Sequence, residues 1–129
     1  MSQERRLDVL EDVVRSKVRS LGDILSDISR DIRSRVNLSK YLLDAVYGHY
    51  VYLSSMLHQL EFWPLGSHRH AEQRRSTLER QIDALKAEAR DERRKCWGDI
   101  EKLRVEQRTW LKQYREAQLR VNVILRGAS

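Results

Sequence analysis

The sequence predicts an all-α protein, a long antiparallel helical hairpin with coiled-coil-like packing, and three observations support this fold class. Strong helix formers dominate the 129 residues, whereas there are only five glycines and one proline. That proline, Pro64, stands near the middle of the chain and is followed by Gly66, so a helix that arrives there must end. Apolar side chains recur at helical spacing on both sides of this turn.

One domain covering residues 1–129 is expected, because a chain of this length is too short for two. We place the first arm at about residues 3–62, the turn at 63–67 and the second arm at about 68–126. Ser67 is a natural N-cap for the second helix. Two arms of matched length around a single turn are typical of a hairpin.

The first arm carries one apolar stripe at steps of three, four or seven residues, as expected for a helix that buries one face. Its members are Leu7, Leu10, Val14, Val18, Leu21, Leu25, Ile28, Ile32, Val36, Leu43, Val46, Tyr50, Leu53, Leu57 and Leu60. Successive steps of four from Ile28 to Val36 depart from a strict heptad. Asn37 and Ser39 are possible caps of a new helix, so a break in the first arm near residue 37 is an alternative. Such a break would allow a compact three-helix core.

The second arm is more regular than the first. Apolar side chains spaced by seven residues form one column, which consists of Ile82, Ala89, Cys96, Leu103, Trp110, Ala117 and Ile124. Charged residues occupy most other positions, as expected for solvated helix faces. If the hairpin turns near residue 65, Leu53 lies near Leu78.

Charge is distributed unevenly along the chain, in which 34% of residues are charged and the mean hydropathy is −0.68. The formal net charge is +6. Residues 1–63 contain nine basic and nine acidic side chains, whereas residues 64–129 contain sixteen and ten. The excess of positive charge in the second half is compatible with an acidic or nucleic-acid partner.

Three features bear on the compartment. The single cysteine, Cys96, cannot form an internal disulfide, which favours a reducing interior. The first residues, MSQERRLDVLED, lack the apolar core of a signal peptide. No charge-free apolar run reaches the ~18 residues of a membrane-spanning helix. We therefore expect an intracellular or cytoplasmic protein, or one within a particle assembled in a reducing interior, that is not secreted and has no transmembrane segment.

The segment from Tyr41 to Trp63 is far more apolar than the rest of the chain. Fifteen of its 23 residues are apolar or aromatic, and only Asp44 and Glu61 carry a formal charge. The opposing residues 68–90 provide few large apolar side chains. These are Leu78, Ile82 and Leu85. Because monomers rarely expose a patch of several hundred Å², we expect this segment to pack against another copy or another protein.

The predicted interface comprises aromatic and large apolar side chains of this segment together with a tryptophan of the second arm. They are Tyr41, Leu42, Tyr47, Tyr50, Val51, Tyr52, Met56, Phe62, Trp63 and Trp97. Tryptophan and tyrosine are frequent hot spots of interfaces. A membrane-surface role for the Phe62-Trp63 tip is an alternative.

The second arm also contains a dense set of basic residues that offers a nucleic-acid alternative. The candidates are Arg69, Arg74, Arg75, Arg80, Arg93, Arg94 and Lys95. Such a row can follow phosphates with a salt-sensitive affinity. Acidic residues are interleaved with it, however, and this arrangement is more typical of solvated helix faces.

No constellation of residues indicates catalysis, a metal or a cofactor. The four histidines gather near the turn without the spacing of a metal site. Cys96 belongs to the apolar column, which favours a core residue over a nucleophile. No glycine-rich phosphate loop is present, and a helix pair has no cavity in which to desolvate a substrate. We expect no enzyme activity.

The leading prediction is therefore a non-enzymatic structural protein. It self-associates as a homo-oligomer or joins other proteins of a larger complex through its apolar face, as a scaffold in a virion or another multi-subunit particle does. The first alternative is a basic helical subunit that binds nucleic acid along the second arm. The second alternative is a stalk-like adaptor of an ATPase or secretion machine.

Overall fold

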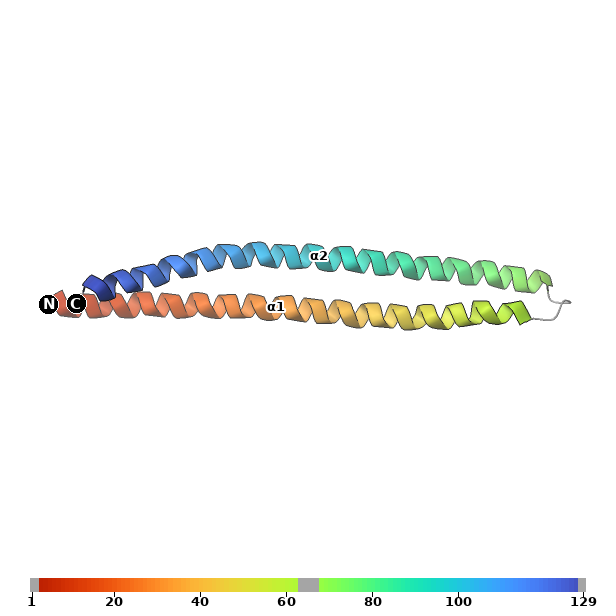
Figure 1. The fold of residues 1–129 in the computed structure, drawn as a ribbon, viewed down its shortest axis with the longest axis horizontal. Coiled ribbons are helices and arrows are strands. Elements are labelled where there is room, and N and C mark those ends of the chain that lie inside the picture. The colour runs from red at the N-terminus through yellow and green to blue at the C-terminus, as the bar shows by residue number, and fades with distance from the viewer. Residues whose placement is uncertain (1–2, 63–67, 128–129) are drawn as a thin grey trace. The chain divides into compact units, whose positions relative to one another are not determined.

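The computed structural model describes residues 3–62 and 68–127, and all regular structure in these ranges is helical. The elements are α1 (Gln3–Gln59), the short 3-10 helix η1 (Leu60–Phe62) and α2 (His68–Gly127). The helices α1 and α2 pack against each other as an antiparallel pair (Figure 1). This packing confirms the predicted all-α helical hairpin. The predicted turn, residues 63–67, lies outside the described residues.

The helix α1 continues through Asn37 and Ser39, so the alternative with a break near residue 37 is wrong. No proline interrupts residues 3–59, so every backbone N–H beyond the first turn can donate within the helix. A capping side chain would compete for backbone N–H groups that already donate within the helix, so it would not stabilise a break there. Ser39 is instead buried on the face that packs against α2, while Asn37 is exposed.

Contacts divide the chain into two compact units, each of which contains part of α1 and part of α2. The first unit consists of Met1–Ser34 and Asp99–Ser129, and the second consists of Arg35–Gly98. The apolar segment that the sequence singles out, as far as the structure describes it, belongs to the second unit. We therefore treat the two units separately.

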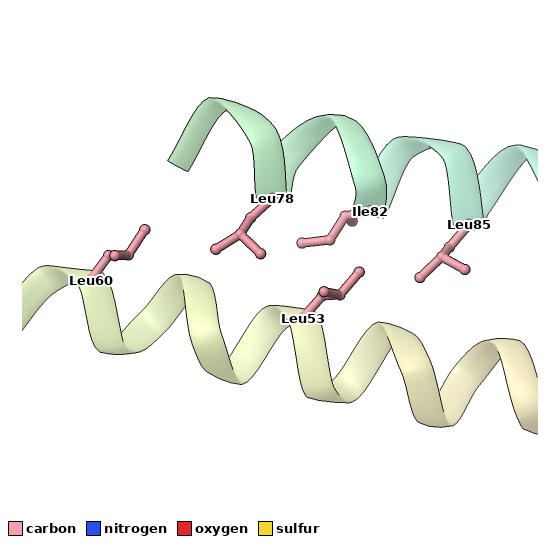
Figure 2. Close-up of a cluster of buried hydrophobic side chains, with 5 residues drawn as sticks. All are labelled: Leu53, Leu60, Leu78, Ile82 and Leu85. Atoms are coloured by element: carbon pink, nitrogen blue, oxygen red, sulfur yellow. The ribbon is translucent and has the colours of Figure 1, made fainter. Parts of the chain in front are cut away.

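The core of the second unit is one cluster of five buried aliphatic side chains. They are Leu53, Leu60, Leu78, Ile82 and Leu85. In Figure 2, the side chains of α1 and η1 point toward those of α2. Because Leu53 and Leu78 share this cluster, the predicted register near the turn is confirmed. Leu78 is only 2% exposed and is the largest fully buried side chain of the described residues.

Most buried and half-buried residues of α1 and η1 in the second unit follow alternating steps of three and four. This core stripe consists of Ser39, Leu43, Val46, Tyr50, Leu53, Leu57 and Leu60. Val36 was expected in the stripe but is 43% exposed. Its neighbour Arg35 is half-buried and lies on the core side of the helix instead. The successive steps of four therefore run from Arg35 through Ser39 to Leu43, and a stutter of this kind locally unwinds a heptad pattern.

The spacing of seven residues in α2 is borne out by burial. Every member of the predicted column, from Ile82 to Ile124, is buried or half-buried. At the other end of the hairpin, Leu7 and Leu10 belong to the predicted stripe of α1 but are exposed. The α1 stripe is therefore better covered from Val14 onward than in its first two turns.

Gly22→Ala in the first unit is expected to raise the free energy of unfolding by about 0.5–1 kcal/mol, because alanine loses less backbone entropy in a helix. A methyl group at this position would lie 3.7 Å from Cε2 of Tyr114, an ordinary van der Waals distance. Urea unfolding at a fixed protein concentration measures the change. Gly48→Ala is the matched control. Its methyl group would meet nothing within 4 Å, so this variant measures the gain from backbone entropy without any side-chain contact. A Gly22→Ala variant less stable than the wild type would contradict this packing.

Candidate protein interface

The apolar surface of the second unit lies on both sides of the α1 core stripe. Successive residues of an α-helix are rotated by about 100°, so residues just before core positions lie on one side and residues just after them on the other. We call the first side flank A, which consists of Leu38, Leu42, Ala45, His49, Tyr52 and Met56. We call the second side flank B, which consists of Lys40, Asp44, Tyr47, Val51, Ser54 and His58.

Flank A is a second stripe with the spacing of a helix-packing seam. Its members follow steps of four and three without interruption, and none of them carries a formal charge. All are exposed except Met56, which is half-buried against the core cluster. Leu38 is 52% exposed and Tyr52 is 61% exposed. A helix with two such stripes is typical of bundles in which it packs against more than one neighbour.

A groove of about 700 Å³ runs beside flank A, between α1 and α2. Its α1 side includes Leu42, Ala45 and His49, and its apolar floor includes Val46 and Leu85. The wall on α2 carries charged side chains of both signs. They are Glu88, Asp91, Glu92, Arg94 and Lys95. The groove therefore combines an apolar floor with a polar wall, as an interface with a hydrophobic core and a polar rim requires.

Flank B lies beside the core residue Tyr50, whose ring contacts both Tyr47 of this flank and Lys86 of α2. The rings of Tyr47 and Tyr50 stack with their centroids 6.4 Å apart, and Nζ of Lys86 lies 6.0 Å from the centroid of Tyr50. The groove on this side measures about 190 Å³ and is also lined by Arg93. Trp97 is 68% exposed and follows Arg93 by one helical turn, which places it on the same side of α2. The cation–π contact of Lys86 with Tyr50 and the stacking of Tyr47 on Tyr50 therefore cover part of the aromatic surface on this side.

The residues predicted for a single interface are thus distributed over both flanks. Flank A or its outer edge contains Tyr41, Leu42, Tyr52 and Met56. Flank B and its side of α2 contain Tyr47, Val51 and Trp97. Tyr50 belongs to the core stripe. Phe62 lies in η1, is 77% exposed, and meets the ring of His58 edge-on at 5.7 Å. Trp63 lies outside the described residues.

Sequence reasoning missed three members of flank A, namely Leu38, Ala45 and His49. Alanine and histidine do not stand out as interface residues by type. Their common signal is position, since each stands one residue before a core position. That signal becomes readable only when the core stripe is known residue by residue.

The basic residues proposed for nucleic acid do not share one face of α2. All seven, from Arg69 to Lys95, are exposed. Arg74 and Arg75 differ by about 100° in direction, and the three consecutive residues 93–95 span about 200° of the helix. Arg80 additionally donates a hydrogen bond from Nε to the carbonyl oxygen of Ser76, at 3.5 Å. The structure therefore presents scattered positive charge and not a continuous basic row.

An ion pair between Arg35 and Glu92 connects the two helices within the second unit. Nη1 of Arg35 lies 2.7 Å from Oε1 of Glu92, and the two side chains are only 16% and 17% exposed. By contrast, the pairs of Arg15 with Glu11 and of Arg30 with Asp27 lie within α1. No buried side-chain nitrogen or oxygen in residues 3–62 and 68–127 lacks a hydrogen-bond partner. The Arg35–Glu92 pair therefore contributes to the register of the helices.

The part of the chain that the structure describes contains no group of three or more histidine, cysteine or carboxylate side chains placed to hold a metal ion. Cys96 is buried with its thiol free. Within the same residues, neither helix has a stretch that is both long and apolar enough to cross a membrane.

Comparisons of the chain with protein family models, with curated proteins and with solved structures found no match. The exposed apolar stripe on flank A and the groove beside it are the features with the clearest physical consequence.

Proposed function

We propose that this is a non-enzymatic structural protein, a helical hairpin that builds or joins a larger assembly by burying flank A against another protein chain. The observation that supports the proposal is the uncharged stripe of 38–56, exposed beside a groove with an apolar floor. Each large apolar side chain that becomes fully buried contributes about 1.5–3 kcal/mol. A contiguous apolar patch, unlike single scattered apolar residues, often marks an interaction site.

The spacing of flank A also indicates what kind of surface covers it. Alternating steps of three and four keep the stripe straight along the helix for about 27 Å. A partner helix matches such a stripe along its whole length, whereas an extended peptide or a compact ligand matches only part of it. The assembly we propose is therefore a bundle of helices. A scaffold inside a multi-subunit particle is one setting for such a bundle.

Nucleic-acid binding along α2 is the second candidate, favoured by the net charge of +6 and by the exposure of the basic residues. It is weaker because those residues are spread around the helix. A stalk-like adaptor would use the same flank A but remain monomeric until its partner is added. The dependence of the assembly on salt separates the first two candidates, since phosphate contacts weaken steeply as salt rises.

Tyr52→Lys is expected to reduce the mass in solution to the 15.4 kDa of one chain, because it places a charge within flank A. Light scattering after size exclusion measures this mass at low and at high salt. Tyr47→Lys is the matched control, since Tyr47 is 66% exposed on flank B and introduces the same charge. The wild type and the control are expected to form a discrete oligomer that persists at high salt.

Three results would contradict self-association through flank A. A wild-type oligomer that dissociates at high salt would favour the nucleic-acid candidate. A wild-type chain that stays monomeric at tens of micromolar under both conditions would exclude self-association and favour the adaptor. Equal effects of Tyr52→Lys and Tyr47→Lys would show that flank A is not the specific surface.

A further inference from the structure

We propose that the chain covering flank A is a second copy of this protein, with its α1 antiparallel to the first along residues 38–56. The inference rests on the proposed function and names the partner of the same surface. Three properties of flank A support a copy of itself as the occupant. They are its charge, the match of side-chain sizes about its midpoint, and its area.

The charge pattern allows two copies to meet along this stripe. Between residues 36 and 60 only Lys40 and Asp44 carry a formal charge, and neither belongs to flank A. Two copies therefore bring no like charges together across the seam, a juxtaposition that costs several kcal/mol when it occurs. Flank A also offers hydrogen-bond donors in His49 and Tyr52. These suit the carboxylates of the groove wall on α2, among them Glu88.

Side-chain sizes favour the antiparallel orientation. Rotation about the midpoint of the stripe pairs Leu38 with Met56, Leu42 with Tyr52 and Ala45 with His49. Leu38 and Met56 have similar volumes, and the other two pairs each combine a smaller side chain with a larger one, which fills the seam evenly. A parallel pair would place two copies of Ala45 together and two copies of Tyr52 together, leaving a void at one level and crowding at another. A two-fold axis makes the antiparallel contact self-complementary and closed.

The exposed area is large enough to contribute a substantial part of a dimer interface. Tyr41 and Tyr52 are 72% and 61% exposed, and Leu38 and Leu42 are 52% and 38% exposed. Together these four side chains present roughly 350 Å² per copy, or roughly 700 Å² for two copies. Specific interfaces start near 1,200 Å² in total. The remaining members of flank A and the groove wall on α2 can contribute the rest of the buried area.

Engineered cysteines test the orientation directly. Two full-length variants, Leu38→Cys and Met56→Cys, are made in a Cys96→Ala background and oxidised with oxidised glutathione, either alone or as an equal mixture. The two positions are 18 residues apart, or about 27 Å along α1. A disulfide requires Cα atoms within about 7 Å. Same-position disulfides are therefore out of reach in the antiparallel dimer, and mixed disulfides are out of reach in a parallel one.

The expected result is a covalent dimer that forms only in the mixture. It should comprise up to about half of the chains, because half of all pairs are mixed when copies exchange freely. Electrophoresis without reductant measures it. Cross-linking of either variant alone would show a parallel pair and overturn the inference, while the proposed function would stand. An oligomer without any cross-link would place the contact elsewhere and would also overturn it.

The wild-type mass distinguishes the failure of the inference from the failure of the proposed function. A wild-type monomer at the same concentration would overturn the inference that a second copy covers flank A. The Tyr52→Lys variant would then add no information about self-association. Helix content by circular dichroism, compared with the Cys96→Ala background, shows that each cysteine variant is folded. A variant that loses helicity is replaced by Leu42→Cys with Tyr52→Cys, a pair at the next level of the same seam.

Discussion

Leu78→Ala is expected to lower the free energy of unfolding by about 2–5 kcal/mol, the largest effect predicted for a single substitution in this protein. Leu78 of α2 is 2% exposed and belongs to the same buried cluster as Leu53 and Leu60 of the opposite arm. The loss combines the transfer free energy of the removed carbons with the cost of a cavity that the helix backbones cannot close. Urea unfolding followed by circular dichroism, at one fixed protein concentration, measures it.

Leu119→Ala is the matched control for this prediction. The same atoms are removed from the same helix, but Leu119 is 63% exposed, so a change within about 0.5 kcal/mol is expected. If Leu78→Ala cost as little as Leu119→Ala, the cluster of Figure 2 would not be the core of the second unit. Protein concentration has to be held constant because association also contributes to apparent stability.

Glu92→Ala is expected to cost about 2 kcal/mol, because it removes a charge-assisted hydrogen bond from a largely buried site. The carboxylate of Glu92 lies 2.7 Å from Nη1 of Arg35 on the opposite helix. Without it, the guanidinium keeps its desolvation cost but loses this attraction. The free energy of unfolding from urea titration gives the change.

A double variant separates the value of the pair from the cost of breaking it. Arg35→Met combined with Glu92→Leu is expected to be clearly more stable than Glu92→Ala, because both charges are removed together and apolar side chains fill the space. Asp27→Ala is the control, since Asp27 and Arg30 form a 2.7 Å pair that is more than 60% exposed on both sides and should change stability by less than about 1 kcal/mol. A double variant as unstable as the single one would contradict this account of the pair.

Local features of the sequence were sufficient for the secondary structure. A single proline followed by glycine divides the chain, and residues 82–124 of the second arm keep a spacing of seven that burial confirms. Such patterns are local because a helix has a fixed period and proline cannot donate a backbone hydrogen bond. Asn37 and Ser39 suggested a break by their type, but capping residues do not end a helix whose backbone hydrogen bonds continue.

The candidate site was only partly predictable. The composition of residues 41–63 indicated that this segment needs cover, and most of the predicted residues are indeed exposed there. The sequence pattern predicted that these residues form a single interface. Neighbouring helical positions differ by about 100°, so Tyr47 and Tyr52 could be assigned to opposite flanks only after the core positions between them were known.

The sequence by itself determined that this chain forms two long helices, and it predicted that the end of the first helix is covered by another chain. Only the tertiary structure decided that Arg35 turns inward where Val36 was expected and that it pairs with Glu92, 57 residues away. Only the tertiary structure showed that Leu38, Ala45 and His49 complete an exposed stripe. The physical reason is that periodicity fixes which residues share a face of one helix. Burial depends on how far the opposite helix covers that face, and this depends on packing between residues distant in the chain.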